Sequence, residues 1–345
     1  YNPSTGSQYL SSAQNYMAMI EDLDPEELGV SVEIHNMAFE IFSVGAGTGG
    51  GFGTTTELRV LKYDEAVNGP DKKEWKEEIQ NEYKRMKKMR VFQEVNRSDL
   101  PQGVKPIDST WALKKKSNGT RRGRLTARGF KQIDGVDYDS ASIHAPMTNA
   151  ISVRLVLTLM LMADWTAEVV DVKGAFLHGQ FTDGERVYME VPKGWREHYN
   201  SNSVLLLLRT IYDLKQAAMA FWKELLKAMK AIGMERSKED PCMYFSWTQW
   251  GLVIIISWID DNMIVGSKEA VKNVKKMFME QFECDDVGPL NEYVGNALEY
   301  TADGGLKFTQ PVLTQSYIDE FDINTDNVWK TPVEAGSVFT KGGPP

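Results

Sequence analysis

Two apolar runs separated by a pair of acids form the clearest pattern along the chain. Residues 251–259 read GLVIIISWI and residues 262–266 read NMIVG, with Asp260 and Asp261 between them. Apolar runs of this length, bounded by turn residues, predict buried strands. The sequence therefore predicts a β-hairpin that carries two adjacent carboxylates where the chain turns.

Apolar residues recur at helical spacing in several other segments, with charged or polar residues between them. One such segment begins near Pro70 and Asp71, another at Pro146, a third covers residues 217–234 and a fourth residues 271–282. The inward faces predicted for the first three helices are Trp75, Ile79, Tyr83 and Met86; Ile151, Leu155, Leu159 and Met162; and Phe221, Leu225 and Met229.

The remaining apolar segments predict strands. Residues 111–116 and 121–130 flank Ser117-Asn118-Gly119-Thr120, a hairpin turn, while residues 167–170 form a short strand that runs into Asp171. Residues 293–295 predict one further strand. Because strands and helices alternate irregularly and include hairpins, the predicted class is α+β rather than a doubly wound parallel sheet.

The first 57 residues have little apolar patterning and end in GAGTGGGFGTTT. Gly45, Gly47 and Gly50 satisfy the G-x-G-x-x-G spacing of dinucleotide-binding proteins, but no helix pattern follows them. Residues 1–57 are therefore predicted to be a flexible Gly-rich linker. The chain begins without Met, and we expect it to be an excerpt of a longer protein.

The formal net charge of −9 argues against an evenly basic surface, yet the basic residues are concentrated in one place. From Ser109 to Ile133 there are eight Lys or Arg residues and no acid. The two cysteines, Cys242 and Cys284, lie far apart, which excludes a disulfide scaffold or a Cys-rich zinc site and fits a reducing compartment. The longest apolar run is too short to span a bilayer, so no membrane partner is expected.

Three acids at strand ends suggest a metal site. Adjacent carboxylates between apolar strands repel each other and are partly desolvated, and a divalent cation would relieve both costs. If the strand that ends at Asp171 lies beside the Asp260-Asp261 hairpin, three carboxylates meet at one sheet edge. Such a cluster can hold two Mg²⁺ ions roughly 3.5–4 Å apart for phosphoryl transfer. The alternative is that these are ordinary turn and strand-end acids.

Several motifs resemble the reverse transcriptase of copia-type retrotransposons. They are DVKGAFLHG, IYDLKQA followed by Phe221-Trp222, and WIDD, in this order, preceded by RLTARGFKQIDGVDYDSAS. Residues 292–295 and 313–318 are similar to two later segments of that family. The match covers roughly residues 62–333, so it does not depend on one short motif.

This resemblance implies an RNA-directed DNA polymerase with a right-hand fold of fingers, palm and at most the start of a thumb. The implied metal-binding and catalytic acids are Asp171, Asp260 and Asp261, holding two Mg²⁺ (or Mn²⁺), with the Val172 carbonyl as a further ligand. Phe176 matches the aromatic residue that excludes a ribonucleotide 2′-OH, and Gln216 a residue close to the incoming nucleotide and template. Simple packing is the alternative role of Phe176, and an exposed helix-start amide that of Gln216.

The basic hairpin then has an expected role. Alternation along a strand places Arg122, Arg124 and Arg128 on one face, and with Lys116 they can supply cations to the triphosphate and the template backbone. Arg124 matches an arginine of the family motif. A solvated basic hairpin without such a role is the alternative.

The predicted regions are the linker at 1–57, fingers at 58–165, palm at 166–300 and the start of a thumb or connection at 301–345, with a partly disordered end. Expected partners are template-primer, deoxynucleotides and the integrase and RNase H segments of the same polyprotein. The implied location is cytoplasmic, in virus-like particles, with an optional nuclear phase. Trp258 and Asp213 depart from the family pattern, which has Tyr and Gly there, so an inactive nucleic-acid-binding remnant is the competing hypothesis.

Overall fold

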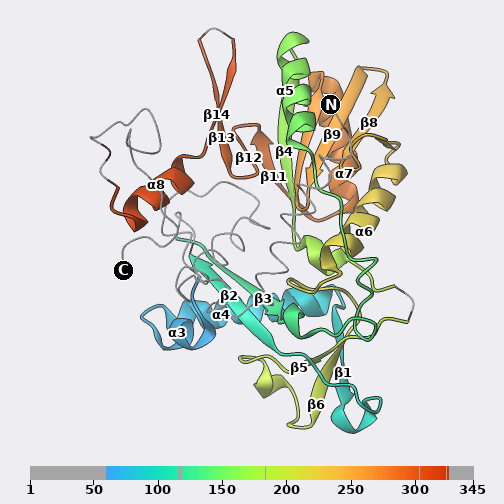
Figure 1. Cartoon of the computed structure of the whole chain (residues 1–345), viewed down its shortest axis with the longest axis vertical. Helices are drawn as coiled ribbons and strands as arrows, with labels where there is room; N and C mark the ends of the chain where they lie inside the picture. Colours follow the sequence, from blue (N-terminus) through green and yellow to red (C-terminus); the bar gives the residue numbers. More distant parts are fainter. Residues whose placement is uncertain (1–59, 116–118, 183, 303, 324, 326–345) are drawn as a thin grey trace, which may run out of the picture.

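An antiparallel six-stranded sheet carries the Asp-Asp hairpin in the computed structural model, which describes residues 60–325 apart from 116–118, 183, 303 and 324 (Figure 1). The strand order is β11-β4-β10-β9-β8-β7. The bounds are β4 (Thr166–Val172), β7 (Glu235–Arg236), β8 (Met243–Thr248), β9 (Gly251–Trp258), β10 (Asp261–Gly266) and β11 (Cys284–Pro289).

One face of this sheet is covered by α6 (Ala217–Ala231) and α7 (Lys268–Gln281). The predicted inward face of α6 is confirmed, because Phe221, Leu225 and Met229 are all buried. Their side chains pack on alternate residues of the strands, such as Val170 and Val172 of β4. Period-two alternation therefore places the intervening residues, among them Asp171, on the opposite face.

That opposite face packs against α5 (Ala150–Met162) and the small sheet of β12 (Glu292–Tyr293), β13 (Asn296–Tyr300) and β14 (Leu306–Thr309). Of the strand predicted at residues 293–295 only Tyr293 lies in a strand, β12, because Val294 and Gly295 both have positive φ and form the β12–β13 turn. A last helix, α8 (Pro311–Glu320), follows β14.

The predicted face of α5 was wrong. Ile151, Leu155 and Met162 are 65%, 55% and 80% exposed, whereas Val156, Leu157 and Met160 are buried against the sheet. The helix is apolar on almost every side, so two stripes satisfy the same 3.6-residue period. Periodicity alone cannot choose between them.

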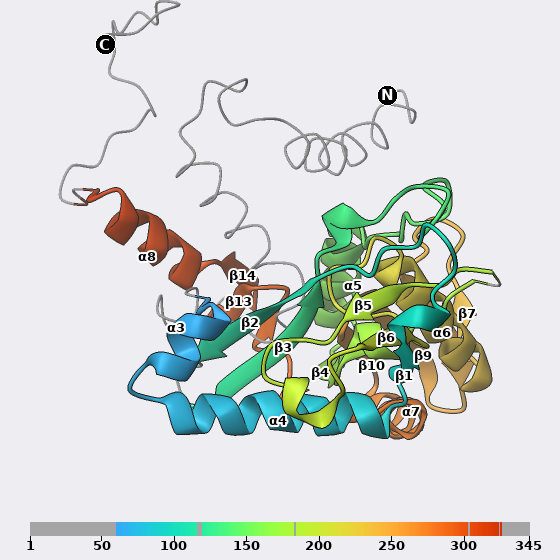
Figure 2. The same ribbon diagram turned by 90° about the horizontal axis from the view of Figure 1, so that it is seen from below.

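A second hydrophobic core lies below the large sheet in Figure 1 and is seen from below in Figure 2. The hairpin of β2 (Ser109–Lys115) and β3 (Arg121–Ala127) packs on α4 (Lys72–Lys88), preceded by α3 (Tyr63–Asn68). A three-stranded sheet completes it, in the order β1 (Phe92–Asn96), β6 (Ser203–Leu207), β5 (Tyr188–Glu190). Short 3-10 helices lie at Arg97–Asp99 (η2), Gly129–Lys131 (η3), Ala175–His178 (η4) and Arg196–His198 (η5).

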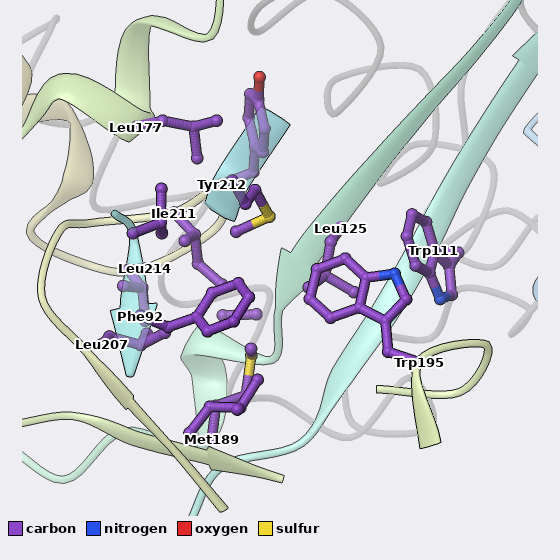
Figure 3. Packing of buried hydrophobic residues seen from close by; sticks show 14 of the residues in the cluster. Phe92, Trp111, Leu125, Leu177, Met189, Trp195, Leu207, Ile211, Tyr212 and Leu214 are labelled. Carbon is purple, nitrogen blue, oxygen red and sulfur yellow. The ribbon is translucent and has the colours of Figure 1, made fainter. Parts of the chain in front are cut away.

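The aromatic residues of this core explain how α4 is anchored (Figure 3). Trp195 is fully buried, packs edge-to-face on Trp111 and donates its indole N–H to the Ile79 carbonyl of α4. The predicted α4 face is mostly confirmed, with Trp75, Ile79 and Met86 buried and Tyr83 at the edge.

The antiparallel sheets and packed helices agree with the predicted α+β class. The predicted strand over 121–130 ends earlier, at Ala127, because the chain then forms η3. The predicted linker at 1–57, the end of the chain beyond residue 325 and Lys116 lie outside the described residues. Within the described part, no helix is long and apolar enough to cross a membrane.

Candidate active site

The hairpin and the strand predicted beside it are hydrogen-bonded neighbours. Strand β10 pairs with β4 so that Asp261 lies directly opposite Asp171, and both fall on the sheet face that packs against α5. Asp260 lies in the two-residue turn between β9 and β10, next to Ile259, whose φ is 54°. The sequence therefore brings the three predicted acids together at one end of the central strands.

Backbone contacts fix the turn that carries Asp260. Its carbonyl oxygen accepts from the Val172 N–H at 2.9 Å and from the Asn262 side-chain amide at 2.9 Å. Val172 itself is 1% exposed and continues β4 past Asp171. These bonds tie the hairpin tip to the end of β4, so the relative position of the three acids is set by main-chain geometry.

The electrostatics of the three acids are those of a crowded anionic site. Asp171, Asp260 and Asp261 are only 7%, 5% and 5% exposed. Burial, followed by the charge of Asp260, raises the pKa of Asp171 to about 6, and burial with both neighbouring acids raises the pKa of Asp261 to about 8. Opposite charge brought into this site would lower the free energy of the ionised carboxylates.

The donor atoms suit a hard divalent cation, since Mg²⁺ prefers one or two carboxylates completed by water and phosphate oxygens. No three His, Cys, Asp or Glu side chains in the described part of the chain form a ready-made metal-holding group. The three acids therefore fit a divalent cation in the type of donor atom that they carry and in the strand register that brings them together. The Asp side chains, rather than the backbone, would have to adjust around an ion.

Two arginines of β3 reach toward these acids. The Arg124 guanidinium lies 3.9 Å from an Asp260 carboxylate oxygen and is 14% exposed. Arg122, two residues earlier on the same strand face, is close enough for its charge to lower the pKa of both Asp171 and Asp261. Burial lowers the pKa of Arg122, but an arginine keeps its charge in proteins.

The other cations of the predicted basic segment are arranged differently. Arg128 lies beyond the end of β3, so it does not continue the face of Arg122 and Arg124, and its guanidinium faces Asp108. Lys115 and Arg121 both pair with Asp71 at the start of α4. Several charges of the hairpin are therefore neutralised within the protein, and the site itself receives Arg122 and Arg124.

Phe176 lies in η4, at the junction of two hydrophobic cores. Its carbonyl accepts from the Thr210 hydroxyl at 2.7 Å, which fixes η4 against the segment after β6. Gly179 permits this contact, because a Cβ there would lie 2.3 Å from the Thr210 hydroxyl oxygen. The ring is partly exposed, follows Asp171 by five residues and packs edge-to-face on the Tyr212 ring.

Gln216 is buried rather than an exposed amide at the start of α6. Its side chain accepts from Gln132 at 3.0 Å and donates to the Asp137 carbonyl at 3.0 Å, while Gln132 also accepts from the Lys215 N–H. Both ends of the amide are thus engaged with protein. Gln216 holds the segment after β3 on the start of α6, and its predicted contact with nucleotide stays a prediction.

Asp213 has a backbone conformation that favours glycine, the residue that the resembling family has at this position. Its φ is 66°, a left-handed conformation that glycine adopts without a steric cost. Its carbonyl oxygen is also tightly packed, because a Cβ at Gly129 would lie 1.9 Å from it. The residue therefore adds a β-carbon and a carboxylate where the backbone favours glycine.

We expect Asp213→Gly to raise the free energy of unfolding by about 0.5–1 kcal/mol, because it removes the steric cost of the left-handed conformation. Urea unfolding of both chains measures the difference. Asp213→Asn is the matched control, since it removes the charge but keeps the β-carbon. A glycine variant that is less stable than the wild type would contradict the strain argument.

Two residues near the site were missed by sequence reasoning. Glu82 is one of the charged residues between the apolar positions of α4 but is fully buried, and the Tyr212 ring centroid lies 5.1 Å from the Arg124 guanidinium. A glutamate at a position adjoining an apolar stripe and a tyrosine in the IYDLKQA motif were the available signals. Neither indicates its partner, because the partners lie far away in the sequence.

Comparisons with known proteins identify the family of this chain. The family described as reverse transcriptase (RNA-dependent DNA polymerase) matches residues 91–335. The chain is 30% identical over 238 residues to a retrovirus-related Pol polyprotein from transposon TNT 1-94 of Nicotiana tabacum, covering 67% of this chain and 17% of that protein. It is 29% identical over 201 residues to the Pol polyprotein from transposon RE1 of Arabidopsis thaliana, covering 56% and 13%.

A yeast relative extends the comparison. The transposon Ty1-LR2 Gag-Pol polyprotein of Saccharomyces cerevisiae is 27% identical over 226 residues, covering 62% of this chain and 12% of that protein. The chain thus spans under a fifth of the length of each of these polyproteins. The family match covers most of the described residues, including all three acids, and the chain belongs to the reverse transcriptase family of copia-type Pol polyproteins.

Proposed function

We propose that this chain extends a primer 3′-OH with deoxynucleotides on an RNA or DNA template. The observation that carries the proposal is the register of β4 and β10, which sets Asp171 opposite Asp261 with Asp260 at the adjoining turn and Arg124 3.9 Å from Asp260. Nucleotidyl transfer from a triphosphate to a primer hydroxyl uses two kinds of group, carboxylates that hold divalent cations and cationic side chains that bind the phosphates.

Each residue has a distinct part in the proposed reaction. Asp171, Asp260 and Asp261 would hold two Mg²⁺ or Mn²⁺ ions, with the Val172 carbonyl as a further ligand. When bound, such ions lower the pKa of the primer hydroxyl and offset charge on the triphosphate. Arg122 and Arg124 bind the triphosphate oxygens and stabilise the charge that develops on pyrophosphate as it leaves.

Phe176 gives the site its sugar preference in this proposal. Phe176 follows Asp171 by five residues and is partly exposed, and its ring would lie against the 2′ position of an incoming nucleotide. A ribonucleotide 2′-OH would collide with it or remain desolvated without a hydrogen bond, and a deoxynucleotide meets neither cost.

The region of the β2–β3 hairpin and α4 would be the fingers and the six-stranded sheet the palm. The predicted boundary between 58–165 and 166–300 does not follow the packing, because α5 packs on the six-stranded sheet and β5 and β6 lie in the lower core. Residues from 301 onward would begin the thumb or connection. The template-primer would be held mainly through phosphates, so binding should weaken with salt and show little sequence preference.

A folded chain that binds nucleic acid without polymerising is the second candidate. Two observations favour it: the Asp213 carboxylate at a glycine-like position, and the buried Trp258 indole nitrogen, which lacks a hydrogen-bond partner among the described residues. Trp258 lies opposite Asp261 across the β9–β10 hairpin, and neither feature removes one of the three acids.

Templated incorporation tests the proposal. A heteropolymeric RNA annealed to a DNA primer is supplied with each deoxynucleotide singly, in Mg²⁺ or Mn²⁺. We expect only the complementary nucleotide to be added, and Asp260→Asn to abolish the addition. Addition of any nucleotide irrespective of the template would be inconsistent with a template-directed polymerase.

A further inference from the structure

The Tyr212 side chain contacts both kinds of group that would meet a nucleotide. The Arg124 guanidinium lies 5.1 Å from the ring centroid, a cation–π distance. The centroid of the Phe176 ring lies 5.7 Å from that of Tyr212, and the two rings are inclined by 85°, an edge-to-face contact. One ring therefore touches both a candidate triphosphate ligand and the candidate sugar wall.

The backbone holds this ring in a fixed place. The Tyr212 carbonyl accepts from the Ala127 N–H at 2.9 Å, where β3 ends, and the residue forms an isolated parallel bridge with Thr126. Tyr212 is 7% exposed and belongs to the core cluster below the sheet. Figure 3 shows its hydroxyl directed away from Phe92 and Met189, so the ring stands at the margin of that cluster.

The phenol contributes as an uncharged ring. Burial, followed by the charge of Glu82, raises the pKa of Tyr212 to about 12, so the ring keeps its proton near neutral pH. A neutral, electron-rich ring face attracts a guanidinium, and its hydrogen-bearing edge or face suits a second aromatic ring. Both contacts depend on the ring, and neither requires the hydroxyl.

We propose that Tyr212 is a positioning residue that sets the sugar selectivity of the site by holding Phe176 while it aligns Arg124 for the triphosphate. The inference rests on the proposed function. It adds that selection of the sugar and binding of the phosphates are coupled through one side chain that itself need not touch the nucleotide.

A core tyrosine without this role would behave differently on substitution. If Tyr212 only stabilises the fold, its loss lowers the amount of active protein and reduces deoxy- and ribonucleotide incorporation by the same factor. If it positions Phe176 and Arg124, its loss changes the ratio of the two incorporation efficiencies and raises the KM for the deoxynucleotide. The ratio is independent of the folded fraction.

The test compares Tyr212→Leu, Tyr212→Phe and Phe176→Val in the full chain, using single-nucleotide primer extension with a deoxynucleotide or the matching ribonucleotide. For Tyr212→Leu we expect about a tenfold loss of sugar discrimination and about a tenfold rise in deoxynucleotide KM. Tyr212→Phe, which keeps the ring, should retain the wild-type sugar discrimination and the wild-type deoxynucleotide KM. Phe176→Val should lose discrimination with little change in KM.

Tyr188→Leu is the matched control, because Tyr188 is also 7% exposed but lies on β5 among the strands of the lower core. It should leave the discrimination ratio and the KM unchanged. If Tyr212→Leu melts below the assay temperature, Tyr212→Met fills the same space without a ring and replaces it in the comparison.

The results of these variants distinguish failure of the positioning role of Tyr212 from failure of the proposed polymerase function. A folded Tyr212→Leu or Tyr212→Met chain with wild-type discrimination and wild-type KM overturns the positioning role. If Phe176→Val keeps full discrimination, the sugar wall lies elsewhere and the inference fails with it. If the wild type incorporates no nucleotide at all, the proposed function fails first.

Discussion

Asp261→Asn is expected to abolish nucleotide incorporation and, at the same time, to make the chain more stable in the absence of divalent cations. The three acids are nearly buried and repel one another, as the raised pKa values of Asp171 and Asp261 indicate. Removing one charge at constant shape relieves that repulsion by about 1–2 kcal/mol. Removing a cation ligand should lower incorporation about 1000-fold or more.

Opposite changes in activity and stability distinguish a functional acid from a structural one. Thermal unfolding with a chelator and with added Mg²⁺ measures the change in stability. The cation should stabilise the wild type more than Asp261→Asn. Asp286→Asn is the control, because this acid lies on neighbouring β11 but is partly exposed and paired with Lys275. A less stable Asp261→Asn chain would mean that the carboxylate serves the fold.

Glu82→Gln is expected to remove part of the pH dependence of stability. Burial raises the pKa of Glu82 to about 7, against a partial offset from Arg85, whose guanidinium lies 2.8 Å from one carboxylate oxygen. The other oxygen has no hydrogen-bond partner among the described residues. A displacement from 4.5 to about 7 corresponds to roughly 3 kcal/mol at pH values above both.

The direction in which stability changes with pH follows from proton binding to Glu82. Between pH 4.5 and 7 the folded chain holds the Glu82 proton that the unfolded chain has released, so the stability contributed by the neutral carboxyl is lost as the pH rises. Glutamine is neutral throughout. The variant should therefore match the wild type near pH 4.5 and exceed its free energy of unfolding by about 2 kcal/mol at pH 8, after loss of the Arg85 pair.

Urea unfolding at pH 5 and pH 8 measures this effect, and the difference between the two chains isolates Glu82 from the other buried acids. Glu77→Gln is the matched control on the exposed side of α4 and should shift neither value. Equal pH dependence in wild type and Glu82→Gln would show that the buried carboxyl titrates normally.

The sequence predicted those features that depend on local pattern. Apolar runs predict β9, β10 and the strand that runs into Asp171. The short turn between β9 and β10 puts Asp260 and Asp261 side by side, and this needs no knowledge of the rest of the fold. The glycine-like conformation of Asp213 follows from one departure in a motif. These are properties of a few consecutive residues, which is why they could be predicted.

Features that depend on distant partners could not be predicted in the same way. The exposed stripe of α5 shares its period with the buried one, so only the packing of the sheet distinguishes them. Gln216 is hydrogen-bonded to Gln132, 84 residues earlier. The burial of Glu82 and the two ring contacts of Tyr212 also join segments from different elements, and no local pattern encodes such pairings.

The most direct test of the central claim is extension of oligo(dT) on poly(rA) by the purified full chain, in Mg²⁺ or Mn²⁺, beside Asp171→Asn. Both chains are first shown to be folded and to bind the template in a salt-sensitive manner. We predict a ladder of products from the wild type and none from Asp171→Asn. Salt-sensitive binding without extension by the wild type, or extension that survives in Asp171→Asn, would contradict the claim that these three acids make the chain a polymerase.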